Sequence, residues 1–184
     1  MDRLWAPWRS KYILGFAKED KPRTGGCIFC DLPAQGADAY RKNLIYAVGQ
    51  RALIIANRFP YNSGHIMVVP TQHVDDPAAL DAADYRVLTE VLRRASIALR
   101  QVLKPDGLNV GMNIGKSAGA GIAAHCHYHL VPRWSGDTNF MPVIGEARVL
   151  SVSLEENYDQ LYPALRGLVA EVEAELVEAE EGKK

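Results

Sequence analysis

Three histidines alternate along one short stretch of the chain, at His125, His127 and His129. On a β-strand, side chains two residues apart point to the same face about 6.5–7 Å from one another, so the three imidazoles would form one row. A neutral imidazole is a good nucleophile near pH 7, because its unperturbed pKa is about 6.5. It can attack phosphorus to form a phosphoramidate, which a second acceptor then breaks. The spacing therefore favours phosphoryl or nucleotidyl chemistry over a surface strand that carries histidines by chance.

A glycine-rich segment, GKSAGAG at residues 115–121, precedes the histidines. Glycine lets the backbone approach a ligand closely, and successive backbone N–H groups can bind phosphate oxygens. A glycine-rich loop is a weak signal by itself. Its position beside three alternating histidines makes a phosphate-binding role the better interpretation.

Cys27 and Cys30 form a Cys-x-x-Cys in a chain with only three cysteines, which cannot make a fully paired disulfide framework. Such a pair is typical of a metal half-site or a redox pair. A closed tetrahedral zinc site needs two more ligands, and His73 and His125 are the candidates. A zinc ion bound there would be structural: it would tie the segment around the cysteines to the histidine strand and keep His125 fixed. The alternative is a reduced, unliganded pair of cysteines. A redox pair is disfavoured, because the helix expected after it is replaced by DLPAQG. The third cysteine, Cys126, is expected in the core.

The elements that must position these residues follow from hydrophobic periodicity. Alternation and turn residues predict strands at 43–48, 52–56, 65–69, 108–113 and 125–131. Apolar residues at helical spacing predict one long helix over 81–103. Ser153 and Glu156 fit a capping box that begins a C-terminal helix, which Pro163 would kink or restart. This order predicts an α+β fold with helices on an antiparallel sheet.

Composition limits the class of protein. The chain has 184 residues, 48% of them hydrophobic and 23% charged, which indicates a globular domain with a real core. The formal net charge of −1 argues against a general nucleic-acid binder, and no apolar run approaches the roughly 18 residues of a membrane span. The first residues lack the apolar stretch of a signal peptide, so a cytoplasmic location is expected. We expect an N-terminal extension at 1–26, a catalytic domain at 27–150, and a C-terminal helix with an acidic tail at 151–184.

The segment HCHYHLV resembles the signature of the histidine triad (HIT) superfamily, His-φ-His-φ-His-φ-φ with φ apolar. Residues 57–69 are similar to the family's nucleotide-facing strand and loop. The flanks at 4–9 and 133–142 resemble the branch that holds diadenosine tetraphosphate phosphorylases and fragile-histidine-triad dinucleoside polyphosphate hydrolases. The resemblance implies a HIT-like fold: a five-stranded antiparallel sheet, one long central helix and a C-terminal helix. It also implies a homodimer, with no nucleic-acid or membrane partner.

The resemblance further implies residue roles. His127 would attack the α-phosphorus of a nucleotide or dinucleoside polyphosphate and carry the nucleotidyl group, His129 would contact the phosphate, and His65 would support the nucleophile. Substrate contacts would come from Asn57, Asn113, Lys116, Ser117, Gly119 and Gly121. The set Cys27, Cys30, His73 and His125 matches the ligands of zinc-bearing members of the superfamily.

One departure leaves the second half of the reaction open. Many members carry Gln or Ser where this chain has Gly121. Help to the leaving group would then come from backbone N–H groups, Ser117 or Lys116, and the final acceptor is phosphate or water. A nucleoside phosphoramidate hydrolase and a non-catalytic nucleotide-binding signalling module are the alternative functions.

Overall fold

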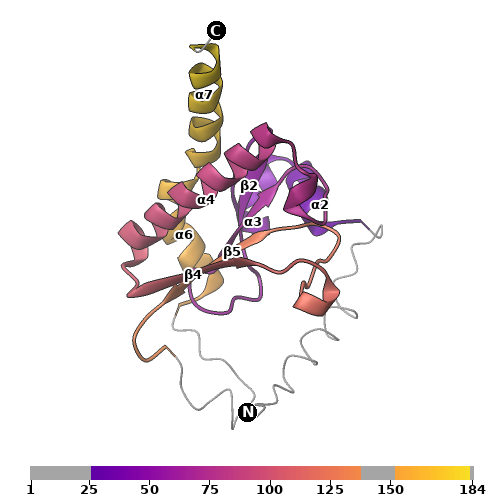
Figure 1. Ribbon diagram of the computed structural model, residues 1–184. Coiled ribbons are helices and arrows are strands. Elements are labelled where there is room, and N and C mark those ends of the chain that lie inside the picture. The colour runs from indigo at the N-terminus through magenta and orange to yellow at the C-terminus, as the bar shows by residue number, and fades with distance from the viewer. Residues whose placement is uncertain (1–25, 138–151, 183–184) are drawn as a thin grey trace.

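The computed structural model describes residues 26–137 and 152–182. Its centre is one antiparallel five-stranded sheet in the order β1-β2-β3-β5-β4 (Figure 1). The strands are β1 (Ile45–Val48), β2 (Ala52–Ala56), β3 (Ile66–Pro70), β4 (Gly107–Met112) and β5 (Tyr128–Arg133). The sheet confirms the predicted α+β class and the five-stranded arrangement.

The long helix α4 (Ala82–Leu103) is the predicted central helix. Its N-cap is Asp81, whose side chain accepts a hydrogen bond from the Asp84 N–H, and it ends at Lys104 in a left-handed conformation. Shorter elements are α2 (Ile28–Asp31), α3 (Tyr40–Asn43) and the 3-10 turns η1 (Pro33–Gln35), η2 (Ala37–Ala39), η3 (Pro77–Ala79) and η4 (Lys116–Ala118). Figure 1 shows α4 running across the sheet.

Both faces of the sheet are covered at β2 and β3, whose residues are all buried. One face packs against α4 and the C-terminal helices through strand residues that include Ile54, Val68 and Leu130. The other face packs against α2 through Leu53 and Met67, together with Phe29. Because alternate residues of a strand point to opposite faces, the two faces are chemically separate, and the histidines lie on the α2 face.

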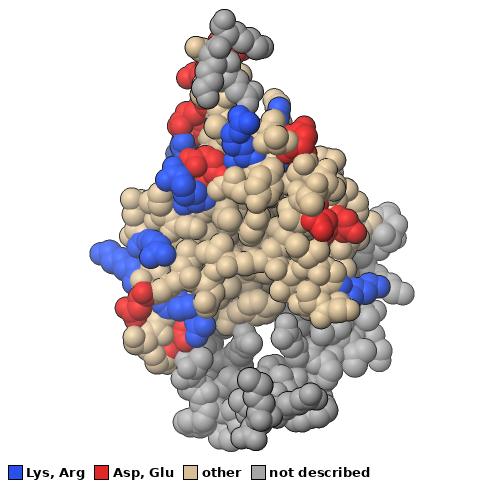
Figure 2. Space-filling view, viewed as in Figure 1, with Lys and Arg blue, Asp and Glu red and all other residues tan. Residues whose placement is uncertain are grey.

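The C-terminal part forms two helices, α6 (Leu154–Leu165) and α7 (Leu168–Glu181). The predicted capping box of Ser153 and Glu156 is present, but the interruption falls at Arg166 and Gly167 and not at Pro163, which lies inside α6. Both helices share the α4-side core with the sheet. Figure 1 shows α7 projecting from the body, and on the face in Figure 2 acidic and basic side chains intermix near α4 and α7, where Arg94 and Glu175 form an ion pair.

The predicted strand over 125–131 is wrong at its start. β5 begins at Tyr128, so His125 and His127 precede the strand and only His129 lies on it. The physical reason is that the backbone here bonds outside the sheet: the Cys126 N–H donates to the Val74 carbonyl and not to a neighbouring strand. The ring N–H groups of His125 and His127 donate to the backbone carbonyls of Pro70 and His125. All but the last residue of the expected N-terminal extension at 1–26, which holds the flank at 4–9, lies outside the described residues, as do residues 138–142 of the flank at 133–142. No helix in the described part of the chain is long and apolar enough to cross a membrane.

Candidate active site and metal centre

His129 lies on β5, between β3 and the edge strand β4. It pairs with Met67 of β3 on one side and with Gly111 of the edge strand β4 on the other. Its ring lies on the face away from α4, since Leu130, the next residue, belongs to the core on the α4 side. The strand register alone therefore places one imidazole of the triplet beside the end of β3.

A tight turn delivers His65 to the same place. Gly64 directly before it has φ of 73°, which favours glycine, and a Cβ there would also force the end of the Leu103 side chain, 2.3 Å away, to move. The Asn57 N–H donates to the His65 carbonyl at 2.9 Å, which closes the turn. Buried His65 then meets His129, with Nε2 of the first 3.0 Å from Nδ1 of the second.

Hydrogen bonds assign the tautomers of this pair. The Tyr61 N–H donates to His65 Nδ1 at 3.0 Å, so that nitrogen carries no proton. The proton of a neutral His65 is on Nε2 and is donated to His129 Nδ1. A neutral His129 therefore carries its own proton on Nε2, where it is a hydrogen-bond donor.

His127 has the opposite arrangement. Its Nδ1 lies 2.9 Å from the backbone carbonyl of His125, which can only accept, so Nδ1 is protonated. Nε2 therefore keeps its lone pair, which no hydrogen bond among the described residues uses. The ring is only 4% exposed and lies between Phe29 and His129, with centroid separations of 4.9 and 4.8 Å. We refer to His65, His127 and His129 as the histidine row.

Burial keeps His127 and His129 of this row neutral. It lowers the pKa of His127 below its ordinary value, although the hydrogen bond to the His125 carbonyl opposes the shift. Burial, followed by the charge that His127 would carry, lowers the pKa of His129 to about 4. At neutral pH both rings are therefore uncharged, as a nitrogen nucleophile and a neutral donor require.

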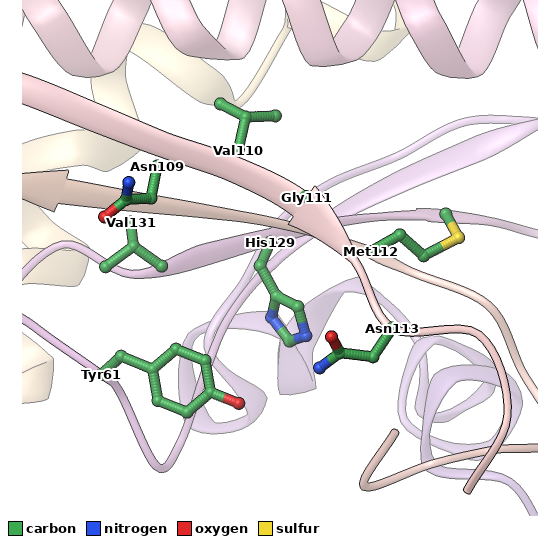
Figure 3. Close-up of a pocket in the computed structure, with 8 residues that line it drawn as sticks. All are labelled: Tyr61, Asn109, Val110, Gly111, Met112, Asn113, His129 and Val131. Carbon is green, nitrogen blue, oxygen red and sulfur yellow. The ribbon is translucent and has the colours of Figure 1, made fainter. Parts of the chain in front are cut away.

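An open groove of about 230 Å³ lies beside the row. Figure 3 shows that Tyr61, Asn113 and His129 lie on one side of the strands and that Val110 points to the other. His129 is among the described residues that line the groove, and His127 is not. The Asn113 amide lies 3.5 Å from the Gly119 carbonyl, which ties the end of β4 to the glycine-rich loop.

The four predicted metal ligands converge. The ligand atoms of Cys27, Cys30, His73 and His125 all lie within 4.8 Å of one another. His125 Nδ1 is 3.3 Å from Cys27 Sγ and 3.7 Å from Cys30 Sγ, and His73 Nδ1 is 3.4 Å from Cys30 Sγ. Donors around a tetrahedral zinc ion stand about 3.5 Å apart, since Zn–S is about 2.3 Å and Zn–N about 2.0–2.1 Å. We call these four residues the metal cluster.

The surroundings of the metal cluster fit a cation. His125 is fully buried and its Nε2–H donates to the Pro70 carbonyl at 2.8 Å, which leaves Nδ1 facing the thiols. Burial, and then the neighbouring Cys27, raise the pKa of the Cys30 thiol to about 11. A bound cation would reverse this preference, because thiolate is the metal-binding form.

The other predicted contact residues are placed less closely. Asn57 is buried and its Oδ1 accepts the Phe59 N–H at 2.9 Å, while its amide nitrogen lies 3.5 Å from His65 Nε2. Lys116 and Ser117 lie in the exposed turn η4 and make no hydrogen bond or ion pair with the histidine row among the described residues. Gly119 ends that turn with φ of 89°.

Three contributors were not predicted from the sequence. Phe29 packs between His125 and His127, Tyr61 sets the His65 tautomer through its backbone, and Asn62 anchors the turn that carries Tyr61. The segment at 57–64 is visibly rich in turn formers, but nothing in the residue types says which backbone N–H meets a histidine. Arg133, at the end of β5, is bound to Asp137.

Residues 40–136 match the HIT domain. The chain belongs to the HIT family. A relative from Mycobacterium tuberculosis described as "AP-4-A phosphorylase" is 33% identical over 159 residues, covering 85% of this chain and 80% of that protein. An uncharacterized HIT-like protein of Saccharolobus solfataricus is 36% identical over 115 residues, covering 62% of this chain and 79% of that one. A crystal structure of a Zn-bound histidine triad family protein from Mycobacterium smegmatis matches with a TM-score of 0.61 at 26% identity, covering 79% of this chain and 97% of that one.

Proposed function

We propose that this HIT protein is a nucleotidyl transferase or hydrolase that cleaves a dinucleoside polyphosphate such as diadenosine tetraphosphate. The observation that supports it most directly is the pair of opposed tautomers: His127 keeps a free Nε2 lone pair, and His129 beside it presents an Nε2–H. One ring can attack an electrophile while the other binds a negatively charged oxygen. A phosphate ester provides both: its phosphorus is the electrophile, and the oxygens bound to that phosphorus carry the negative charge.

In the first step His127 Nε2 forms a bond to the α-phosphorus, and the bond between that phosphorus and the bridging oxygen breaks. The leaving nucleoside polyphosphate takes the electron pair, and His129 donates a hydrogen bond to a phosphate oxygen. In the second step phosphate or water attacks the same phosphorus, the N–P bond breaks and His127 is restored. Asn57, Asn113, Lys116, Ser117, Gly119 and Gly121 are the proposed substrate contacts.

The metal cluster is proposed to bind a structural zinc ion through Cys27, Cys30, His73 and His125. The donor set and the distances near 3.5 Å support this assignment, as does the zinc named for the M. smegmatis relative. Zinc would hold α2 against the segment before β5 and fix His125, whose carbonyl orients His127. Thiol ligands must stay reduced, which favours a reducing compartment such as the cytoplasm. A homodimer is proposed from the resemblance to the family.

Product analysis tests the function. The protein is incubated with diadenosine tetraphosphate, with and without phosphate, and the nucleotides are resolved. ADP plus ATP formed only with phosphate identifies a phosphorylase, and AMP plus ATP formed without it identifies a hydrolase. Turnover of a nucleoside phosphoramidate alone identifies the phosphoramidate hydrolase. Absence of turnover, with thermal stabilisation by nucleotide, would overturn the proposal in favour of a binding module.

A further inference from the structure

Asn62 anchors the turn that leads into β3. Its Nδ2 group donates to the Pro132 carbonyl at 3.0 Å and to the Asp137 carboxylate at 2.8 Å. Its Oδ1 accepts the Ser63 N–H at 3.0 Å, and its backbone carbonyl accepts the His65 N–H at 3.2 Å. Both amide hydrogens and the amide oxygen are used, so this one side chain ties the turn to the end of β5.

The acceptor on the β5 side is itself rigid. Arg133 binds the Asp137 carboxylate with two nitrogens, Nε at 2.6 Å and a terminal nitrogen at 2.7 Å. The Trp134 N–H donates to the same carboxylate at 3.0 Å, and Arg133 also reaches Asn109 Oδ1 of β4 at 3.0 Å. Asn62 is therefore held by a carboxylate whose position three other groups determine.

Tyr61, the residue before Asn62, sets the direction of the hydrogen bond between His65 and His129. The Tyr61 N–H points at His65 Nδ1, and a backbone amide neither ionises at neutral pH nor exchanges the roles of donor and acceptor. His65 must then donate from Nε2 to His129 Nδ1. A proton on His129 Nδ1 would face the His65 proton, and His65 could move its own proton to Nδ1 only against the Tyr61 amide. His129 is thus left with its proton on Nε2.

We propose that Asn62 is a positioning residue that, by holding the Tyr61 amide against His65, fixes His129 as a hydrogen-bond donor. The groove beside His129 then favours a ligand group that only accepts hydrogen bonds, a phosphate oxyanion, and disfavours a cationic amine. The assignment of phosphate as that group rests on the proposed function; the tautomer of His129 does not.

Nitrogen NMR on ¹⁵N-labelled protein reads the tautomer directly through the correlations of ring nitrogens with ring carbon-bound protons. In the unaltered protein at pH 7 we expect His129 to be protonated at Nε2. In Asn62→Ala we expect a mixed population with a substantial Nδ1–H fraction. The affinity for AMP, used as the probe, should fall about tenfold, as when one hydrogen bond to a charged group is lost.

Two matched variants separate positioning from general damage. Tyr61→Ala removes the side chain but keeps the backbone N–H, so the His129 tautomer should not change. Asn157→Ala removes an amide that likewise bridges two acceptors, the carbonyls of Val152 and Ser153 just before α6. This amide is far along the chain from the histidine row. The variant should lower stability and leave the tautomer and AMP affinity as they were.

The outcomes are distinguishable. An Nδ1–H tautomer in the unaltered protein, or an unchanged tautomer in Asn62→Ala, overturns the proposal. If Asn62→Ala does not fold, Asn62→Ser keeps an oxygen for the Ser63 N–H and is judged by the same criterion. If the tautomers behave as stated but diadenosine tetraphosphate is not cleaved, the proposed function fails while the role of Asn62 stands.

Discussion

The metal cluster and the histidine row lie side by side but use their imidazoles in opposite ways. His125 gives its Nε2–H to the Pro70 carbonyl and turns Nδ1 toward two thiols. His127, two residues later, gives its Nδ1–H to the His125 carbonyl and keeps Nε2 free. Both residues are histidines. In each ring, the nitrogen that donates to a backbone carbonyl is occupied, and the other nitrogen is left to bind a metal or attack a substrate. Metal binding and nucleophilic attack can therefore be assigned to neighbouring rings without a difference in side-chain chemistry.

The metal cluster and the histidine row are also linked by direct contacts. The carbonyl that orients His127 belongs to His125, a member of the metal cluster, and Phe29 packs against both rings at centroid distances of 5.4 and 4.9 Å. An ion that immobilises His125 consequently immobilises the acceptor of the His127 hydrogen bond. The metal cluster should affect catalysis through orientation, which is a smaller effect than removal of the nucleophile.

The largest difference between the groups is expected from His127→Ala. This variant removes the only ring of the row that has a free, unprotonated Nε2, so turnover of diadenosine tetraphosphate should fall at least about 10³-fold, as for removal of a covalent nucleophile. Initial rates measure this. A labelled nucleotidyl adduct should be trapped by an alkaline quench, in which the N–P bond survives, in the unaltered protein and not in His127→Ala. Zinc content should not change, because His127 belongs to the row alone.

Cys126→Ala is the matched control for that experiment. Cys126 adjoins both groups in sequence but is buried, with burial raising the pKa of its thiol to about 11, so it is a packing residue. We expect near-normal turnover and zinc content. Substantial turnover by His127→Ala would remove the basis for distinguishing the histidine row from the metal cluster.

The converse change, Cys27→Ser, should mainly affect stability. Loss of a thiolate ligand weakens the ion that ties α2 to the segment before β5, so zinc measured by atomic absorption should fall well below one equivalent. The melting temperature should fall by about 10 °C, and turnover by only about tenfold to a hundredfold. Zinc retained at full stoichiometry with an unchanged melting temperature would contradict a structural metal at this cluster.

The sheet and the long helix could be predicted because their signals are local. Alternation of apolar residues identified β1 to β4 to within two residues, and helical spacing identified α4 to within one residue. The predicted strand over 125–131 was wrong at its start for a physical reason. Alternating histidines are typical of a strand, but the rings of His125 and His127 bind backbone carbonyls in a segment that precedes β5. Periodicity reports side-chain direction and does not report where the backbone hydrogen bonds go.

The sequence could predict which Cys and His residues form the candidate site, but not which hydrogen bonds orient their rings. The ligand set of the metal cluster was recognisable, since Cys and His are few in the chain and chemically distinctive. The contribution of Tyr61 is a backbone N–H, which every residue except proline has, so no residue type announces it. Asn62 likewise gains its role only when the turn meets Asp137, 75 residues later.

A smaller effect should distinguish the rings by pH. The pKa of His129 is lowered from 6.5 to about 4 in the folded protein, so between these values the unfolded chain binds more protons. The contribution of His129 to the free energy of unfolding should therefore be fully present above pH 6.5 and should be lost as the pH falls toward 4. His129→Gln should make this decline shallower by about 1–2 kcal/mol, less than the full shift gives because the ring is partly exposed. Urea unfolding at pH 7.5 and 5.0 measures it, and parallel pH profiles for the two proteins would contradict the assignment.

The smallest effect is expected in the glycine-rich loop, which we assign to the histidine row and not to the metal cluster. A Cβ at Gly121 would meet no atom within 4 Å and its φ is not positive, so Gly121→Ser should change the free energy of unfolding by less than about 0.5 kcal/mol. The added hydroxyl could donate to the leaving phosphate and raise kcat by up to about fivefold, with zinc content unchanged. Gly119→Ser is the contrasting variant, because φ of 89° strains any side chain and should cost about 1 kcal/mol. Equal losses of stability in Gly121→Ser and Gly119→Ser would contradict the expected difference between the two positions. An unchanged kcat in Gly121→Ser would mean that this position does not face the reacting phosphate.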